Sequence, residues 1–473
     1  MIFRKVGLTV VLAIAFGSGV YILASQRQTN DRPAMDGEQI ADGSPVAAIS
    51  SNAPAEELPE EFVPWNRFRG PNGSGHSDDK QIPSEWSDNK NLSWKLKLPG
   101  FGSSSPILTK SYVFVTCYSG YGVPGERGGS SDDLFRYLCC IDRKTGKEVW
   151  KKEFPNDVRE DGYQGNGLPE HGYATNTPVT DGKSVFAFFG KSGVFAFDLK
   201  GKQLWKKSVG TDSANRRWGS AASLLLYKNL VIVNAAEEGR AIVAFDKDSG
   251  EEVWKAEADS LELCYSTPVI ASSKSRDELV IAVPGEVWGM NPNNGKLFWY
   301  AETPLTGNLS PSINLAGDNA YVFGGYRSSG SVSIQLGGKG DVTKSHVKWS
   351  QRNSSYVATP ILLKDRMYWI DDKGTFYCVN TKDGELVHRE RLRLGSSNRP
   401  VYASGIAIDG KLLFQTRYGG VVVVSPSDEL NIVSTNRFES DESQFNATPA
   451  VGSGQLFLRS DTHLYCVTKT AKK

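Results

Sequence analysis

One pattern recurs along most of this chain: an apolar run, a polar turn that contains glycine, and a second run that ends in tryptophan. The clearest copies are YLCCIDRKTGKEVW (137–150), VFAFDLKGKQLW (194–205), IVAFDKDSGEEVW (242–254) and VWGMNPNNGKLFW (287–299). Weaker copies lie at 333–349, 376–388 and 421–430. A repeat of about 40 to 56 residues, built from short strands and turns, is typical of a β-propeller. The pattern predicts one toroidal domain.

A second landmark opens each repeat. It is a small or hydroxyl residue, often next to proline, followed by a strand, a tight turn and another strand. The openers begin at Ser103, Thr175, Ser220, Ser266, Ser310, Ala358, Ala403 and Ala447. Alternating apolar residues such as those at 185–188 support half-buried strands. Eight openers predict an all-β fold over residues 94–473: an eight-bladed β-propeller of four-stranded antiparallel blades.

The two ends of the repeat region complement each other. The last repeat stops soon after LYCV (464–467), without a fourth strand or a closing tryptophan. WKLKL (94–98) precedes the first opener and has no repeat of its own. We therefore expect this N-terminal strand to complete the last blade, which closes the ring and removes its exposed edges.

Three segments precede the propeller. Residues 1–26 combine basic Arg4 and Lys5 with an apolar run, which predicts a signal peptide or an uncleaved signal-anchor. Residues 27–61 are rich in Ser, Ala, Pro, Asp and Glu and are expected to form a disordered linker. We therefore expect an exported protein, periplasmic or in the cell envelope, with a membrane tether if the first segment is not cleaved.

Residues 62–93 form a lead-in that we expect to pack on the propeller. Its glycine-rich part, WNRFRGPNGSG (65–75), follows no strand and lacks the GK[ST] of a phosphate-binding loop. The aromatic side chains of Trp65, Phe68 and Trp86 are expected to cover the outside of a blade.

Composition and motifs exclude several classes of function. The net charge is +1, with acidic and basic residues evenly mixed, so a nucleic-acid partner is not expected. The five histidines have no metal-ligand spacing, and no HExxH, CxxC or GxSxG motif occurs. Asp142, Asp198 and Asp246 recur at the turns and are expected to hydrogen-bond there. The sequence therefore assigns no catalytic residue and no metal ligand.

The Asp/Asn-x-x-x-Gly-Lys/Glu-x-x-Trp closers and the TP openers resemble the PQQ-like (quinoprotein) repeat family. The resemblance covers about four fifths of the chain, from Trp94 to the C-terminus. It implies that the closing tryptophans pack between adjacent blades: Trp150, Trp205, Trp254, Trp299 and Trp349. The family includes PQQ-dependent dehydrogenases and non-catalytic envelope propellers of the BamB-like kind. The WxxFRGPxGxG lead-in is similar to that of exported PQQ-like proteins from planctomycete-type bacteria.

The adjacent cysteines Cys139 and Cys140 are the strongest hint of quinone chemistry, because methanol-type PQQ dehydrogenases place a disulfide between adjacent cysteines against the quinone. Here, however, the pair lies within a regular strand, where neighbouring side chains face opposite ways. Cys378 and Cys466 occupy the repeat position of Cys140, and alanine or glycine fills it in other repeats. We interpret this as a tight buried position and expect no structural disulfide, although Cys140 with Cys466 is the least implausible pair.

Loop lengths distinguish the two faces of the predicted ring. Turns after the first and third strands of each blade are short, whereas loops after the second and fourth strands vary widely in length. Long irregular loops on a rigid scaffold are where binding is usually located. Aromatic and arginine residues in these loops form the candidate interaction face: Tyr173, Arg217, Trp218, Tyr265, Tyr326, Tyr356 and Arg399.

Three functions remain open at this point. The first is a monomeric, non-catalytic scaffold that binds an envelope protein on its variable face and needs no cofactor. The second is a dehydrogenase dependent on PQQ and Ca²⁺, for which no local motif supplies the ligands. The third is a carbohydrate-binding propeller that uses the tyrosine-rich loops.

Overall fold

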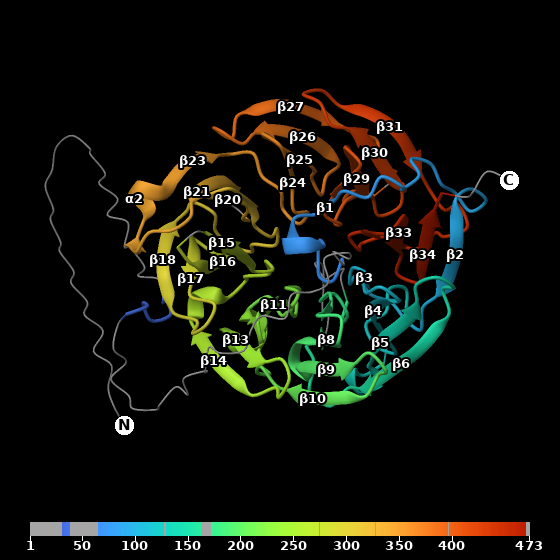
Figure 1. Ribbon diagram of the computed structural model, residues 1–473, viewed down its shortest axis with the longest axis horizontal. Helices are drawn as coiled ribbons and strands as arrows, with labels where there is room; N and C mark the ends of the chain where they lie inside the picture. The colour runs from blue at the N-terminus through green and yellow to red at the C-terminus, as the bar shows by residue number, and fades with distance from the viewer. Residues whose placement is uncertain are drawn as a thin grey trace, which may run out of the picture.

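Eight sheets surround a central axis and form a closed ring (Figure 1). The computed structural model describes residues 31–37, 65–126, 129–161, 172–273, 275–326, 328–395 and 397–469. Each sheet has four principal antiparallel strands, and each blade runs from the innermost strand to the outermost in chain order, except at the closure of the ring. The eight-bladed propeller predicted from the openers is confirmed.

The first four blades follow in sequence. Blade one contains β3 (Ile107–Leu108), β4 (Tyr112–Ser119), β5 (Phe135–Asp142) and β6 (Glu148–Pro155). Blade two contains β7 (Val179–Thr180), β8 (Ser184–Phe188), β9 (Val194–Asp198) and β10 (Gln203–Lys207). Blade three contains β11 (Leu225–Tyr227), β12 (Leu230–Ala235), β13 (Ala241–Asp246) and β14 (Glu252–Glu257), with the short helix α1 (Ala236–Gly239) after β12. Blade four contains β15 (Val269–Ser272), β16 (Asp277–Val283), β17 (Glu286–Met290) and β18 (Leu297–Glu302).

The remaining blades complete the circle. Blade five contains β19 (Asn314–Ala316), β20 (Asn319–Gly324), β21 (Gly330–Gln335) and β23 (Val347–Gln351). Blade six contains β24 (Ile361–Leu363), β25 (Arg366–Ile370), β26 (Thr375–Asn380) and β27 (Leu386–Arg391). Blade seven contains β28 (Ile406–Ile408), β29 (Lys411–Gln415), β30 (Val421–Ser425) and β31 (Asn431–Asn436). Blade eight contains β32 (Ala450–Gly452), β33 (Gln455–Arg459), β34 (His463–Thr468) and β2 (Leu92–Lys97).

The N-terminal strand β2 closes the ring as predicted. It pairs antiparallel with β34, and Trp94 stands opposite Cys466 in the register. The last blade therefore takes its outermost strand from the start of the domain, and each end of the repeat region holds the other. Two short strands add to other blades. β1 (His76–Ser77) runs parallel to β28, and β22 (Gly340–Asp341) runs parallel to β18.

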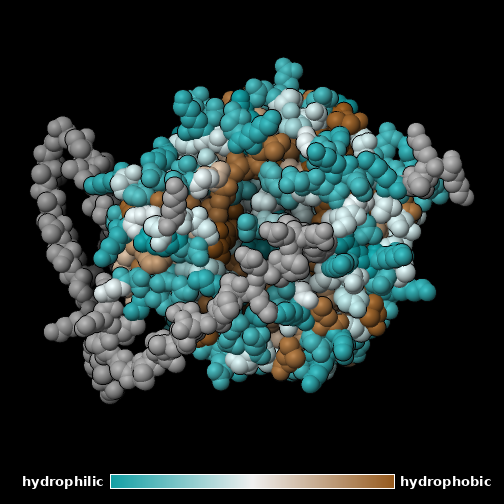
Figure 2. All heavy atoms as spheres, in the orientation of Figure 1, coloured by the Kyte–Doolittle hydropathy of each residue, from teal (hydrophilic) through white to brown (hydrophobic). Residues whose placement is uncertain are grey.

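The core lies between the blades. The middle strands are buried on both faces, as in β5, where all six inner positions are buried. The outermost strands alternate between covered and exposed residues, as in β6, because one of their faces meets solvent. Adjacent blades share apolar clusters, such as Phe186 and Trp205 of blade two with Val231 and Phe245 of blade three. Figure 2 shows a largely hydrophilic surface, with an apolar band beside the centre of the ring.

Closing tryptophans join most blades to the next. The indole Nε1 of Trp150 donates to the carbonyl oxygen of Leu199 (3.0 Å), which lies in the last turn of blade two. Gly201 of that turn has a φ of 86°, and a Cβ there would lie 2.9 Å from the Trp150 ring, so the repeat requires glycine. Equivalent bonds to the next blade come from four other tryptophans: Trp94, Trp205, Trp254 and Trp349.

Trp299 departs from this arrangement, whereas Trp94 on the N-terminal strand follows it. The indole of Trp299 donates to Glu278 Oε2 of its own blade (2.9 Å), although its ring is fully buried between blades four and five. The last turn of blade five is replaced there by a longer segment that carries β22 and the helix α2 (Thr343–His346). The acceptor that the other tryptophans use is therefore replaced by a carboxylate.

The lead-in does not cover the outside of a blade throughout, which corrects the expectation for Trp65. Residues 65–77 lie in the centre of the ring (Figure 1). The N–H of Leu108, on an innermost strand, donates to the Trp65 carbonyl oxygen (2.8 Å). Arg69 is fully buried and donates to the carbonyl oxygen of Pro360 (2.9 Å). Trp86, in contrast, packs beside the outermost strand of blade seven, where its backbone N–H donates to Asn436 Oδ1 (2.9 Å).

A short N-terminal segment, residues 31–37, docks on the outer strand of blade four. It falls within the range predicted to be a disordered linker, so for these residues the structure differs from that expectation. The N–H of Asp36 donates to the Leu297 carbonyl oxygen (2.7 Å). Arg32 Nε donates to Glu286 Oε2 (2.8 Å), and the guanidinium lies 3.7 Å from the centre of the Tyr300 ring. A buried carboxylate and an aromatic face thus hold one arginine.

We expect Arg32→Gln to release this segment. Glu286 is 1% exposed in its side chain, so removing its cation leaves a buried charge without its partner, an unfavourable state of about 3–5 kcal/mol. Hydrogen exchange at the Asp36 amide, followed by mass spectrometry, should become at least about tenfold faster. Arg366→Gln, which breaks an exposed ion pair on blade six, is the control. An unchanged exchange rate at Asp36 would show that main-chain pairing alone holds the segment.

Candidate interaction face

The variable loops emerge together on one side of the ring. Because the strands of a blade alternate in direction, loops after the second strand and after the fourth strand share a face. These loops include 208–224 and 303–313, whereas 181–183 and 364–365 on the other face are tight turns. Most of the predicted interaction residues lie in the loops that lead from one blade to the next. They are Tyr173, Arg217, Trp218, Tyr265, Tyr356 and Arg399.

Five of the predicted residues join Arg216 in a continuous set, which we call the aromatic–arginine belt: Arg216, Trp218, Tyr265, Tyr326, Tyr356 and Arg399. The rings of Trp218 and Tyr265 stack at 6.1 Å, and the rings of Tyr326 and Tyr356 lie 6.1 Å apart. The Arg216 guanidinium lies 5.7 Å from the Trp218 ring and 6.0 Å from the Tyr326 ring, so it links the two pairs. Arg399 lies 5.6 Å from the Tyr356 ring and extends the belt.

Exposure within the belt is uneven. Tyr326 is 45% exposed and Trp218 is half-buried, so both present surface to a ligand. Tyr265 is buried, and its ring stacks against that of Trp218. It is therefore not the surface residue that the sequence predicted. The Tyr356 hydroxyl accepts a hydrogen bond from Asn308 Nδ2 (3.0 Å), which fixes the ring.

Tyr173 belongs to a different cluster. Its ring stacks on Tyr121 at 6.0 Å and meets Tyr118 edge-on at 5.7 Å. Its hydroxyl donates to the carbonyl oxygen of Asp161 (3.0 Å), and burial raises the pKa of this hydroxyl. Tyr173 therefore packs the loops of blade one against each other at the margin of the belt.

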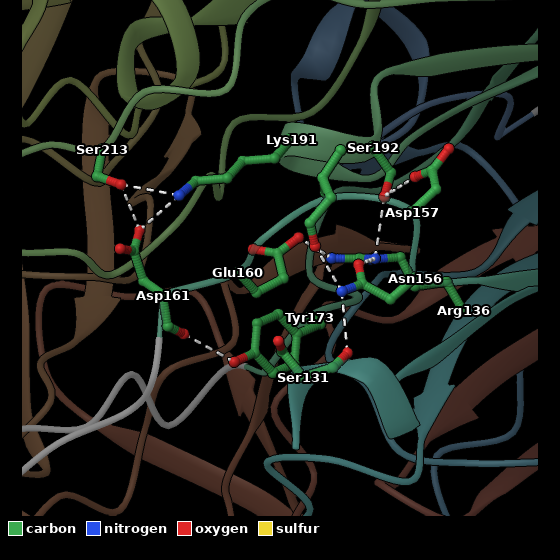
Figure 3. A network of polar contacts seen from close by, with 11 residues as sticks. Ser131, Arg136, Asn156, Asp157, Glu160, Asp161, Tyr173, Lys191, Ser192 and Ser213 are labelled. Carbon is green, nitrogen blue, oxygen red and sulfur yellow. Dashed lines mark hydrogen bonds and ion pairs between the residues drawn. The ribbon is translucent and has the colours of Figure 1, made fainter.

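A polar network lies below this margin, between blades one and two (Figure 3). Arg136 forms an ion pair with Glu160 and donates to Asn156 Oδ1 (2.9 Å). Lys191 Nζ donates to Asp161 Oδ2 (2.9 Å) and to Ser213 Oγ (2.8 Å). These cations are therefore neutralised by neighbours within the network. Arg217 is only at its edge, with its side chain 72% exposed and 4.0 Å from Asp161.

Two glutamates at the base of this network were missed by sequence reasoning. Glu237 and Glu238 lie in α1 and are 3% and 1% exposed. Burial raises the pKa of Glu237 to about 7, and burial together with the charge of Glu237 raises that of Glu238 to about 8. The available signal was NAAEEGR (234–240), in which two acids directly follow an apolar strand. These residues form the four-residue helix α1, which connects β12 to β13.

The cavities limit which cofactor the face could hold. The cavity next to Glu237 and Glu238 encloses about 30 Å³, which is room for roughly one or two water molecules and not for a tricyclic quinone. A cleft of about 510 Å³ lies between blades seven and eight, lined by Tyr418, Phe438 and Phe445. Its carboxylate Asp441 already accepts hydrogen bonds from Ser460 (2.6 Å) and Tyr465 (2.7 Å).

Within the described residues, no group of three or more His, Cys, Asp or Glu side chains is arranged to hold a metal ion. All six cysteines are buried free thiols, Cys139 and Cys140 included. Burial raises the pKa of the Cys140 and Cys466 thiols, so these residues behave as small apolar groups.

The same described part of the chain has no helix long and apolar enough to cross a membrane. Residues 1–26, where the signal or anchor is predicted, lie outside it.

Comparison with known proteins identifies the family. The family model described as outer membrane protein assembly factor BamB, whose repeats are of the PQQ-like type, matches residues 88–258, 172–323 and 324–473. Together these matches span more than half of the chain. The chain belongs to this family.

Relatives of this BamB-like PQQ repeat family share the fold at low sequence identity. The outer membrane protein assembly factor BamB of Shewanella oneidensis is 22% identical over 348 residues, which cover 69% of this chain and 78% of that protein. The crystal structure of BamB from Moraxella catarrhalis aligns with a TM-score of 0.55 at 13% identity, covering 81% of this chain and 98% of that one. The quinohemoprotein alcohol dehydrogenase of Comamonas testosteroni aligns with a TM-score of only 0.40, at 10% identity over 87% of this chain and 81% of that one, which assigns no activity.

Proposed function

We propose that this protein is an exported, non-catalytic scaffold of the cell envelope that binds a protein partner on the aromatic–arginine belt. The belt supports this proposal because tryptophan, tyrosine and arginine dominate the energetics of protein interfaces. Trp218 and Tyr326 are rigid side chains with few rotatable bonds, so little entropy is lost when a partner covers them. Membership of a family named for an assembly factor agrees with a role in binding.

Photo-crosslinking in the native envelope tests the proposal. A photoreactive amino acid at Tyr326, which is 45% exposed, is expected to capture one protein reproducibly. The same group at Leu386, which is 44% exposed on the outer strand of blade six, is the matched control and should capture nothing specific. Equal capture at both positions, or at neither, would contradict a partner on the belt.

We expect Trp218→Ala to weaken partner binding about 30-fold or more, because a central aromatic anchor contributes about 2 kcal/mol or more. The purified partner is titrated by calorimetry against the wild type and the variant. Trp218 lies in a loop outside the shared cores of the blades, so the unfolding midpoint should stay close to that of the wild type. A variant that binds as tightly as the wild type would remove Trp218 from the interface.

A further inference from the structure

The base of the cavity at blades one to three holds buried carboxylates with few hydrogen-bond donors. Among the described residues, both side-chain oxygens of Glu237 and one of Glu238 have no hydrogen-bond partner, although both side chains are almost fully buried. The hydroxyl of Tyr265, which supports the belt, faces the Glu237 carboxylate as a donor. Buried carboxylates without donors are unfavourable, and such groups are usually retained at sites that bind a ligand.

The charges around the cavity favour a cation. Lys191, Arg136 and Arg217 line it, but each of them already lies against Asp161 or Glu160. Arg240 faces Glu237 but is already paired with Glu262 at 3.3 Å. The acids that remain without an ion pair among the described residues are Asp212, Glu237 and Glu238. The site is therefore short of positive charge and of hydrogen-bond donors.

The size of the cavity selects among cations. The cavity is open on one side, and its volume of about 30 Å³ holds roughly two water molecules. A compact ammonium group, which carries three donors, fits this space. A guanidinium is planar and larger, with a fork of five donors. Trp218 and Tyr173 line the same cavity, so aromatic surface is available for the methylene chain that leads to an ammonium.

We propose that this cavity receives the side-chain ammonium group of a lysine presented by the protein partner. The inference rests on the proposed function and specifies the chemistry of the partner: a lysine beside the surface that covers Trp218. The ammonium donates to Glu237 and Glu238, and its methylenes pass along Trp218. Gly190 makes room for this arrangement, because a Cβ there would lie 3.1 Å from Glu238 Oε1.

Binding of a lysine ammonium group in this cavity should depend on pH. The carboxyls of Glu237 and Glu238 have raised pKa values, about 7 and 8, whereas a lysine remains charged throughout this range. Binding of the ammonium requires ionised carboxylates and therefore releases protons. Affinity should rise at least about tenfold from pH 6 to pH 8. The charged groups facing the pair are Asp161, Glu160, Lys191, Arg240 and Glu262.

The test uses N-acetyl-lysine amide as the probe and N-acetyl-norleucine amide, which lacks the ammonium, as its control. Saturation-transfer NMR on the full chain at pH 8 is expected to show the lysine probe binding at least tenfold more tightly. Glu237→Gln with Glu238→Gln should remove this preference. Glu385→Gln, the same change on an exposed glutamate of blade six, should leave it within twofold. Equal binding of both probes to the wild type, or an unchanged preference in the double variant, would overturn the proposal.

This result is separable from the test of the scaffold role. The probes need no protein partner, so preferential binding of lysine stands even if photo-crosslinking captures nothing. Conversely, capture at Tyr326 that is undiminished in the Glu237→Gln, Glu238→Gln variant would keep the scaffold role and reject the lysine site.

Discussion

Trp205→Ala is expected to lower the free energy of unfolding by about 3–5 kcal/mol, because it removes a large buried ring and leaves a cavity between blades two and three. Trp205 is 7% exposed, packs against Phe186 and Phe245, and donates to the Lys247 carbonyl oxygen at 3.0 Å. Urea unfolding followed by circular dichroism measures the change as a lower midpoint.

The neighbouring Leu204→Ala serves as the control for this experiment. Leu204 is on the same strand but is 43% exposed, so its truncation should change the unfolding free energy by no more than about 0.5 kcal/mol. If both variants unfold at the wild-type midpoint, the tryptophan joints do not hold adjacent blades together. A large loss of unfolding free energy for Trp205→Ala alone would show that the closing tryptophan is a main contact between these two blades.

The stability of the protein is expected to fall as pH rises from about 5 to about 9. In the unfolded chain Glu237 and Glu238 ionise near pH 4.3. In the folded protein their pKa values are about 7 and about 8, because burial disfavours the charged form. Between these limits the folded state binds more protons, so the free energy of unfolding decreases with pH. Each pH unit between the unfolded and the folded pKa corresponds to about 1.4 kcal/mol, so the two groups together set an upper limit on the order of 9 kcal/mol for this loss.

Replacing both acids by glutamine removes the titrating groups at nearly constant shape. The unfolding free energy of Glu237→Gln with Glu238→Gln should exceed that of the wild type at pH 9 and vary less with pH. Glu385→Gln, on an exposed turn of blade six, should keep the wild-type slope. A double variant with the wild-type slope would show that other groups set the pH dependence.

These two results bear on the proposed lysine site as well. Residues that destabilise the folded protein at neutral pH are retained more readily where they contribute to binding. If the double glutamine variant is more stable and also loses its preference for a lysine probe, stability and binding oppose each other at the same two side chains. The cavity would then be a binding site that the empty protein keeps at a cost.

The candidate face was only partly predictable from sequence. Loop length and residue type pointed to Trp218, Tyr326, Tyr356 and Arg399, because those signals are local. Sequence reasoning also placed Tyr265 on the surface, although its ring is buried beneath Trp218. Glu237 and Glu238 were passed over because exposed acids are common in loops, and only the packing of blades two and three buries them.

The sequence by itself determined the number of blades, the closing strand and the glycines and tryptophans of the repeat. The repeat recurs around the ring, and the two incomplete ends complement each other, so the sequence pattern records these features. The tertiary structure alone decided what does not repeat: the lead-in in the centre of the ring, Arg32 on Glu286, and the acceptor that Trp299 uses. The last two contacts join residues more than 20 positions apart in the sequence. The lead-in contacts several blades at once. The physical reason is that such contacts depend on which surfaces the closed ring brings together, and no local periodicity records that.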